Sequence, residues 1–171
     1  MIIRRARPGD ADAIYSLIEK NRERGHLLPR TAAEITARIS STASFYVADA
    51  GAEPQSRLVA CAEVARLSRA VAEIRSLVVD EPFRGQGVAS KLVSTLHRRA
   101  FLDGHDRLCA FSHDPAPFIR LGFSIVPHAW IPEKISADCA GCALFRQCGQ
   151  HALVLFIARR SSQWQSWWDA A

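Results

Sequence analysis

The sequence predicts an α/β fold, with a mixed central sheet flanked by helices in one domain. Two observations support this. Short apolar runs typical of strands alternate with segments whose apolar residues recur at helical spacing. In addition, one strand turns into a long helix through the glycine-rich connection "RGQG" at residues 84–87. The 171 residues are enough for an ordinary core, and 49% apolar with 23% charged residues is typical of globular proteins.

Strands are expected where short apolar runs are bounded by turn residues. The loop "GAEPQSR" at residues 51–57 should join the second and third of them as a hairpin. The late segment 127–150 shows little periodicity. The expected strands are residues 1–5, 45–48, 58–67, 71–80, 107–112, 122–126 and 152–158.

Four helices are expected between these strands. Asp10 should cap the first, and its apolar face should end before the charged residues 22–25. A capping box, "TAAE" at residues 31–34, begins a short second helix. The third helix, residues 88–102, carries apolar side chains at helical spacing, and a short fourth helix covers residues 118–121.

Composition excludes several classes of protein. No run approaches the roughly 20 apolar residues of a membrane span, and the start "MIIRRARPGD" lacks the apolar core of a signal peptide. We therefore expect a cytoplasmic location and no membrane partner. The net charge of +5 is carried mostly by arginine, which suits an anionic ligand. Because the basic residues form no tight block, nucleic acid is not expected as a partner.

The five cysteines are an odd number, which favours free thiols or a metal site over a disulfide framework. Two of them lie in expected strands and should belong to the core. Cys139, Cys142, Cys148 and His151 have the spacing C-x2-C-x5-C-x2-H, which could hold zinc. The cluster could also be a redox-sensitive thiol pair or a set of buried small apolar residues. Burial is favoured, and no metal is assigned.

The glycine-rich turn suits a phosphate group. Free backbone N–H groups and the positive end of the helix dipole meet where a strand leads into a helix N-terminus. Ser90 stands where a dinucleotide fingerprint needs its third glycine, and no G-K-[S/T] follows, so the turn is neither that fingerprint nor a P-loop. Gly85 and Gly87 could also simply make a tight connection.

Residues 84–89, "RGQGVA", resemble the acyl-coenzyme A loop of the GNAT superfamily of N-acetyltransferases, with the pattern [Q/R]-x-x-G-x-[G/A]. The context is similar too. A long apolar strand precedes this loop, a helix follows it, and "FIRLGF" at residues 118–123 resembles the superfamily's Y-x-[R/K]-x-G-F segment. The resemblance covers residues 1–125 and implies the acyl-CoA N-acyltransferase (GNAT) fold with acetyl-CoA as co-substrate.

This resemblance also implies roles for individual residues. The end of the central strand would pair with the pantetheine arm as an added strand does, and the N–H of Val78 would polarise the thioester carbonyl. The turn would hold the pyrophosphate, and residues 118–120 would flank the thiol and the adenine side. The residues implied to bind the coenzyme are Leu77, Val78, Val79, Arg84, Gly85, Gln86, Gly87, Val88, Ala89, Ser90, Phe118 and Arg120.

Acetyl transfer to an amine needs a base for the ammonium proton and gains from an acid that protonates the thiolate. Glu73 is the expected base, because similar histone acetyltransferases carry theirs four residues before the position of Leu77. It could instead pair with a neighbouring arginine. Many members use a tyrosine as acid where this chain has Phe118, which has no proton to give. Ser112, His113 and ordered water are the substitutes, and Ser112 is assigned.

Three separated segments resemble the short, single-domain N-acetylglutamate synthases of bacterial arginine biosynthesis. They are L-P-R at residues 28–30, E-I-R-S-L at residues 73–77, and P-E-K followed by D-C-x-x-C at residues 132–142. The resemblance implies acetylation of the α-amine of L-glutamate. The chain departs from the group after Cys148, where Gly149-Gln150-His151 follows, so glutamine and aspartate stay open as acceptors.

Four residues are expected to hold this acceptor. Arg30 and Arg75 would grip its carboxylates, Ser76 could add a hydroxyl donor, and Lys134 would add a point charge. Arg75 should share one strand face with Glu73 and Leu77, because side chains alternate along a strand. Structural ion pairing is the alternative for both arginines.

We expect residues 1–160 to form one domain, with 127–150 as a cysteine-containing insertion, and 161–171 to form a tryptophan-rich tail. Packing of this tail on the domain or on a second subunit of a homodimer is favoured over membrane contact. Two other functions stay open: acetylation of another small amine, a lysine or a peptide terminus, and a catalytically weak coenzyme-binding regulatory module.

Overall fold

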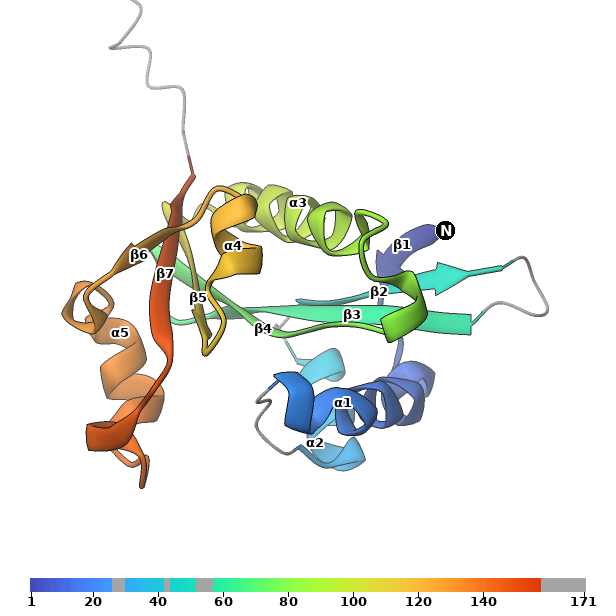
Figure 1. Ribbon diagram of the computed structural model, residues 1–171, viewed down its shortest axis with the longest axis horizontal. Coiled ribbons are helices and arrows are strands. Elements are labelled where there is room, and N and C mark those ends of the chain that lie inside the picture. The colour runs from blue at the N-terminus through green and yellow to red at the C-terminus, as the bar shows by residue number, and fades with distance from the viewer. Residues whose placement is uncertain (26–29, 42–43, 52–56, 158–171) are drawn as a thin grey trace, which may run out of the picture.

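The computed structural model describes residues 1–25, 30–41, 44–51 and 57–157. They form one seven-stranded sheet in the order β1-β2-β3-β4-β5-β7-β6 (Figure 1). Neighbouring strands run antiparallel except β4 and β5, which are parallel. The strands are β1 Ile2–Arg5, β2 Ser44–Ala50, β3 Arg57–Arg66, β4 Val71–Val79, β5 Arg107–Ser112, β6 Ser124–Val126 and β7 His151–Phe156.

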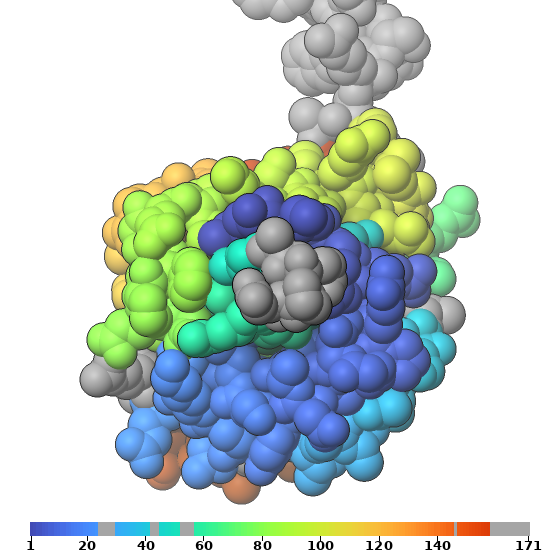
Figure 2. Space-filling model, turned by 90° about the vertical axis from the view of Figure 1, so that its right-hand side faces the viewer, coloured from blue at the N-terminus to red at the C-terminus, as the bar shows by residue number. Residues whose placement is uncertain are grey.

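Helices cover both faces of this sheet. α1 (Ala11–Gly25) and α2 (Ala32–Ser40) pack on one face, while α3 (Val88–Leu102) and α4 (Ala116–Arg120) lie on the other (Figure 1). Seen from the side of β1, α1 and the beginning of α3 lie on opposite sides of the strand ends (Figure 2). Each face buries its own apolar cluster, so the domain has the three layers typical of helix-covered sheets.

The element order confirms the predicted α/β fold class, and α3 and β5 have the predicted bounds. The capping box at Thr31 and Glu34 is also present. Asp10 was wrongly predicted as a helix cap. It lies in a 3-10 turn, Pro8–Asp10, where its carboxylate accepts hydrogen bonds from Arg4 and from the backbone of Arg7. Helix α1 continues to Gly25, and Arg22 and Glu23 are exposed, so its apolar face ends before them as predicted.

A bulge divides β4 into two parts. Two steps along β3, from Cys61 to Glu63, face three steps along β4, from Val78 to Arg75. Ser76 takes up the extra residue with φ 50°, a left-handed conformation that is unusual for a residue other than glycine. The prediction that Leu77 shares a face with Arg75 is therefore wrong. The extra residue reverses the alternation, so Leu77 packs on the α3 side and Val78 on the α1 side.

The sheet opens where β4 and β5 meet. These strands pair only from Val71 to Ile74 on β4 and from Arg107 to Ala110 on β5. Beyond that point β5 continues to pair with β7 through Ser112, and β4 continues to pair with β3. The second half of β4 therefore has an edge toward β5 that no strand occupies in the described part of the chain.

The segment between β6 and β7 is built from short helical turns on the α1/α2 side of the sheet (Figure 1). A 3-10 turn, His128–Trp130, leads to α5 (Pro132–Lys134), a π-helical turn, Ile135–Cys139, and another 3-10 turn, Phe145–Gln147. These turns lie within residues 127–150, the segment expected to be a cysteine-containing insertion and called the insertion below. The tryptophan-rich tail, residues 161–171, lies outside the described residues.

Cys61 and Cys109 are buried in the core, as expected, and burial raises the pKa of the Cys61 thiol to about 12. Cys139 is half-buried, whereas Cys142 and Cys148 are exposed, so the prediction that the cysteines of this cluster are buried is wrong for these two. Within the described residues no group of three His, Cys, Asp or Glu side chains is arranged to hold a metal ion. None of the helices described for this chain could cross a membrane.

Candidate active site

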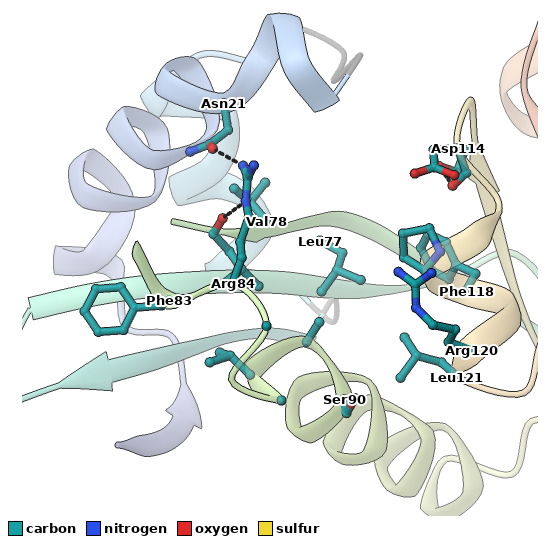
Figure 3. A pocket seen from close by; sticks show the side chains of 17 residues that line it. Asn21, Leu77, Val78, Phe83, Arg84, Ser90, Asp114, Phe118, Arg120 and Leu121 are labelled. Atoms are coloured by element: carbon teal, nitrogen blue, oxygen red, sulfur yellow. Dashed lines mark hydrogen bonds between the residues drawn. The ribbon is translucent and has the colours of Figure 1, made fainter. Parts of the chain in front are cut away.

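A cavity of about 700 Å³ lies where β4 and β5 separate. The second half of β4 and the turn into α3 line one side of it, and the end of β5 with α4 lines the other (Figure 3). The predicted coenzyme residues line it with one exception, Gln86, whose side chain instead donates to the carbonyl of Pro82. The predicted residues at the cavity are Leu77, Val78, Val79, Arg84, Gly85, Gly87, Val88, Ala89, Ser90, Ser112, Phe118 and Arg120.

The glycine-rich turn presents a helix N-terminus to this cavity. Gly85 and Gly87 have φ of +73° and +75°, which side chains disfavour. A Cβ added at either position would meet no atom within 4 Å, so these glycines are required by backbone conformation and the space beside them is open. Gly87 caps α3 without any side-chain hydrogen bond, and the first turn of α3 has no acidic residue. The turn therefore keeps N–H groups and positive dipole available for an anion.

Arg84 joins this turn to the rest of the site. Its Nε donates to the carbonyl of Val79 at 3.1 Å, and one guanidinium nitrogen donates to Oδ1 of Asn21 at 2.7 Å (Figure 3). Asn21 is itself buried on α1, where its amide donates to the carbonyl of Leu17. The turn is thus tied to the end of β4 and to α1. Sequence reasoning missed Asn21, because a polar residue on a helix carries no signal of a tertiary partner.

The far end of the cavity contains few groups that could donate a proton. Phe118 lines it and packs edge-on against Phe123, with ring centroids 5.4 Å apart. Ser112, the last residue of β5, also lines the cavity, and its hydroxyl donates to the carbonyl of Asp114 at 2.8 Å. Ser112 is therefore the predicted acid that the structure brings to the cavity.

On the opposite face of β4 a half-buried ion-pair network surrounds the buried Glu73. Arg75 donates to Oε2 of Glu73 at 2.6 Å, and Lys134 donates to Oε1 at 2.7 Å. Both cations also bind the same oxygen, Oδ2 of Asp138, at 2.5 Å and 2.8 Å. The structure therefore brings together three predicted site residues, Glu73, Arg75 and Lys134. It also adds Asp138, which was not predicted.

The network stands at the point where the sheet opens. Arg75 is the first residue of β4 beyond its last pair with β5, and Phe111 is the corresponding residue of β5. Lys134 lies over the Phe111 ring, with Nζ 5.2 Å from its centroid. Burial disfavours the charged form of Arg75, yet Glu73 and Asp138 outweigh it and hold its pKa above the usual value. Arg75 therefore stays charged at the inner end of the gap.

Arg30 and Ser76 complete the predicted acceptor residues. Burial is the main cause that lowers the pKa of Arg30, and the charges of Arg38 and Arg75 add to it, which places Arg30 near the network. Arg38 itself binds Oε1 of the fully buried Glu63 at 2.5 Å. Ser76 forms the bulge, and its carbonyl accepts a weak hydrogen bond from Sγ of Cys61.

Comparison with known proteins identifies the family. The family model described as "Acetyltransferase (GNAT) family" matches residues 11–123, which include the turn and α4. The chain belongs to the GNAT acetyltransferase family. It is also 30% identical over 152 residues, 89% of this chain and 94% of its relative, to an uncharacterized N-acetyltransferase, CT2212, of Chlorobaculum tepidum. The chain is thus an acetyl-CoA-dependent N-acetyltransferase, as its sequence predicted.

Solved structures show the same GNAT fold. Rv2747 from Mycobacterium tuberculosis, solved with CoA, has a TM-score of 0.77 at 20% identity, over 92% of this chain and all of that one. N-acetylglutamate synthase from Neisseria gonorrhoeae, solved with CoA and N-acetyl-glutamate, has a TM-score of 0.78 at 26% identity. This chain is covered over 92% of its length by that match but spans only 35% of the Neisseria enzyme.

For this GNAT enzyme, some important residues could not be read from the sequence. Asp138 carried one usable signal, since it lies four residues after Lys134, a spacing that pairs side chains on a helix. Glu63 offered only an acidic residue within the apolar run of β3. The contacts of Glu63 with Arg38 and of Asp138 with Arg75 join elements far apart in the chain, and no local pattern encodes them.

Proposed function

We propose that this GNAT enzyme transfers the acetyl group of acetyl-CoA to the α-amine of a small acidic amino acid, with L-glutamate as the first candidate. One observation carries the proposal. Two half-buried cations, Arg75 and Lys134, converge on a single carboxylate oxygen beside Glu73, at the inner end of the gap that would receive the thioester. An amine bound through its carboxylates there would lie next to both the thioester and a carboxylate base.

The coenzyme would bind in the open cavity. The turn from Arg84 to Ser90 offers backbone N–H groups and the α3 dipole to the pyrophosphate. The unpaired edge of β4 beyond Ile74 offers its backbone to the pantetheine amides, and the N–H of Val78 would polarise the thioester carbonyl. The two solved relatives contain CoA, which supports coenzyme binding by the same fold.

The acceptor would enter from the opposite face, under the insertion. Arg75, Lys134 and Arg30 present positive charge there, and an amino acid with two carboxylates satisfies more of it than a lysine side chain does. The Neisseria relative is an N-acetylglutamate synthase solved with N-acetyl-glutamate, which supports glutamate over other acceptors. An acidic or open groove, as a peptide substrate with a lysine would need, is not what this charge favours.

The reaction would be direct. Glu73 would first accept the ammonium proton, through a water molecule, because Arg75 and Lys134 already occupy both of its oxygens. The neutral amine nitrogen then attacks the thioester carbon, an N–C bond forms, the carbon–sulfur bond breaks, and the nitrogen gives up a second proton to water as the amide forms. The coenzyme leaves as a thiolate, to which Ser112 at the cavity would pass a proton once its hydroxyl turns from the carbonyl of Asp114.

The test is release of free thiol from acetyl-CoA by the purified full chain, with glutamate, glutamine, aspartate or a lysine-containing peptide as acceptor. We expect glutamate to be preferred, and Arg75→Ala to raise its KM roughly 10- to 100-fold, because a bidentate grip is lost. Arg66→Ala is the matched control, since Arg66 is exposed at the end of the neighbouring strand β3.

Two results would overturn the proposal. Preference for the lysine peptide, or equal KM values in Arg75→Ala and Arg66→Ala, would show that Arg75 does not bind a carboxylate of the acceptor. Tight binding of acetyl-CoA without turnover of any amine would favour a regulatory module, which the absence of a hydroxyl on Phe118 would then explain.

A further inference from the structure

The cations expected to grip the acceptor are already bound to a carboxylate of the enzyme. Oδ2 of Asp138 lies 2.5 Å from a guanidinium nitrogen of Arg75 and 2.8 Å from Nζ of Lys134. One oxygen thus bridges both cations, as an acceptor carboxylate would be expected to do. Any such acceptor must therefore take the place of Asp138 or find no free cation at this point.

The side chain of Asp138 is free to move away from the network, whereas those of Arg75 and Lys134 are held in place. Its side chain is 39% exposed, while those of Arg75 and Lys134 are 13% exposed. Asp138 belongs to the π-helical turn Ile135–Cys139, and turns of this type are often found at functional sites. Its carboxylate can rotate toward the solvent without moving any buried side chain. Arg75 and Lys134 remain fixed by Glu73, and Lys134 also by the ring of Phe111.

The charges favour such an exchange. Around the network lie four cations, Arg30, Arg38, Arg75 and Lys134, and three carboxylates, Glu63, Glu73 and Asp138. With Asp138 turned out, two positive charges are left without a partner. Glutamate in its reactive form, with a neutral amine, carries two carboxylates and would balance them, whereas glutamine carries one. The exchange therefore favours a dicarboxylate.

We propose that Asp138 determines acceptor specificity by occupying the carboxylate position at Arg75 and Lys134, from which a dicarboxylic acceptor displaces it. The inference deepens the proposed function and rests on it for the identity of the acceptor. It assigns Asp138 a competing role, opposite in sign to that of a residue that merely orients the two cations. Removing a competitor tightens acceptor binding, whereas removing an orienting group weakens it.

The experiment measures binding of glutarate, which has the two carboxylates of glutamate but no amine, to the full chain by calorimetry. Asp138→Asn removes the competing charge at an exposed position and should leave the fold intact. The pairs given up are partly exposed and individually weak, so we expect glutarate to bind roughly 3- to 10-fold more tightly. Asp103→Asn, which neutralises an exposed carboxylate paired with Arg99 on α3, should leave glutarate binding unchanged.

Unchanged or weaker binding in Asp138→Asn overturns the inference, and so does the absence of glutarate binding in all variants. The proposed function fails separately. If glutarate binds more tightly to Asp138→Asn but no dicarboxylic amino acid is acetylated, the competing role of Asp138 stands and the acceptor assignment falls. When both hold, Asp138→Asn should also lower the KM for glutamate by a similar factor and raise the preference for glutamate over glutamine.

Discussion

Glu73 shows how one residue can serve structure and chemistry together. It is buried, and both of its oxygens accept hydrogen bonds from cations, which is the ion pairing that its sequence left open as an alternative. The same cations are proposed to bind the acceptor, however, so the pairing does not exclude a role as base. With the acceptor held at Arg75 and Lys134, Glu73 would take its proton through a water molecule.

We therefore predict that Glu73→Gln lowers kcat at least 100-fold, because the base is lost, while the KM for acetyl-CoA stays within about threefold, because the coenzyme cavity lies on the other face of β4. Thiol release measured from pH 6 to 9 checks this, and the melting temperature shows whether the buried amide is tolerated. Glu133→Gln, on the segment that carries Lys134, is the control, since Glu133 pairs with Arg107 and not with Arg75 or Lys134. If kcat falls less than threefold, the base lies elsewhere, and Oε2 of Glu63, which has no hydrogen-bond partner among the described residues, is the next group to test.

At the scale of elements, the glycine turn was predictable and the bulge was not. Gly85, Gly87 and the apolar spacing of α3 are local features, and local features determine backbone conformation at a turn. The bulge at Ser76 depends on how β4 pairs with β3, which no window of sequence contains. For the same reason the sequence predicted Arg75 and Lys134 as acceptor residues but not Asp138 or Asn21, which bind Arg75 and Arg84 on segments distant in the chain.

The turn yields a prediction of its own. Gly87→Ala should raise the KM for acetyl-CoA roughly tenfold, because a side chain at φ +75° costs about 1–2 kcal/mol and shifts the N–H groups that face the anion. The KM for the acceptor should not change, since the network lies on the other face of β4. Gly9→Ala is the matched control: the added Cβ meets open space there too, without a positive φ. Equal effects of the two variants on the KM for acetyl-CoA would mean that the turn does not contribute to coenzyme binding.

The whole molecule consists of two half-sheets joined along a short seam. β1 to β4 carry α1, α2 and the acceptor cation Arg75, whereas β5 to β7 carry α4 and lead into the insertion with Lys134. The four residue pairs between β4 and β5, together with α3, hold the halves together in the described structure. The coenzyme cavity extends along the open part of this seam, with lining residues from both halves. A ligand bound there would contact both half-sheets where β4 and β5 do not pair.

Acetyl-CoA bound along this seam should therefore stabilise the folded chain, with most of its binding free energy supplied by the α3 turn. At 100 times its Kd, a ligand that binds only the folded state adds about 2.7 kcal/mol, which for a chain of this size raises the melting temperature by roughly 5–10 °C. Pantetheine reaches the edge of β4 but lacks the pyrophosphate, so at equal concentration we expect a shift below about 2 °C. Differential scanning calorimetry of the full chain compares the two. Equal shifts would mean that the strand edge, and not the dipole and N–H groups of the α3 turn, supplies most of the coenzyme's binding free energy.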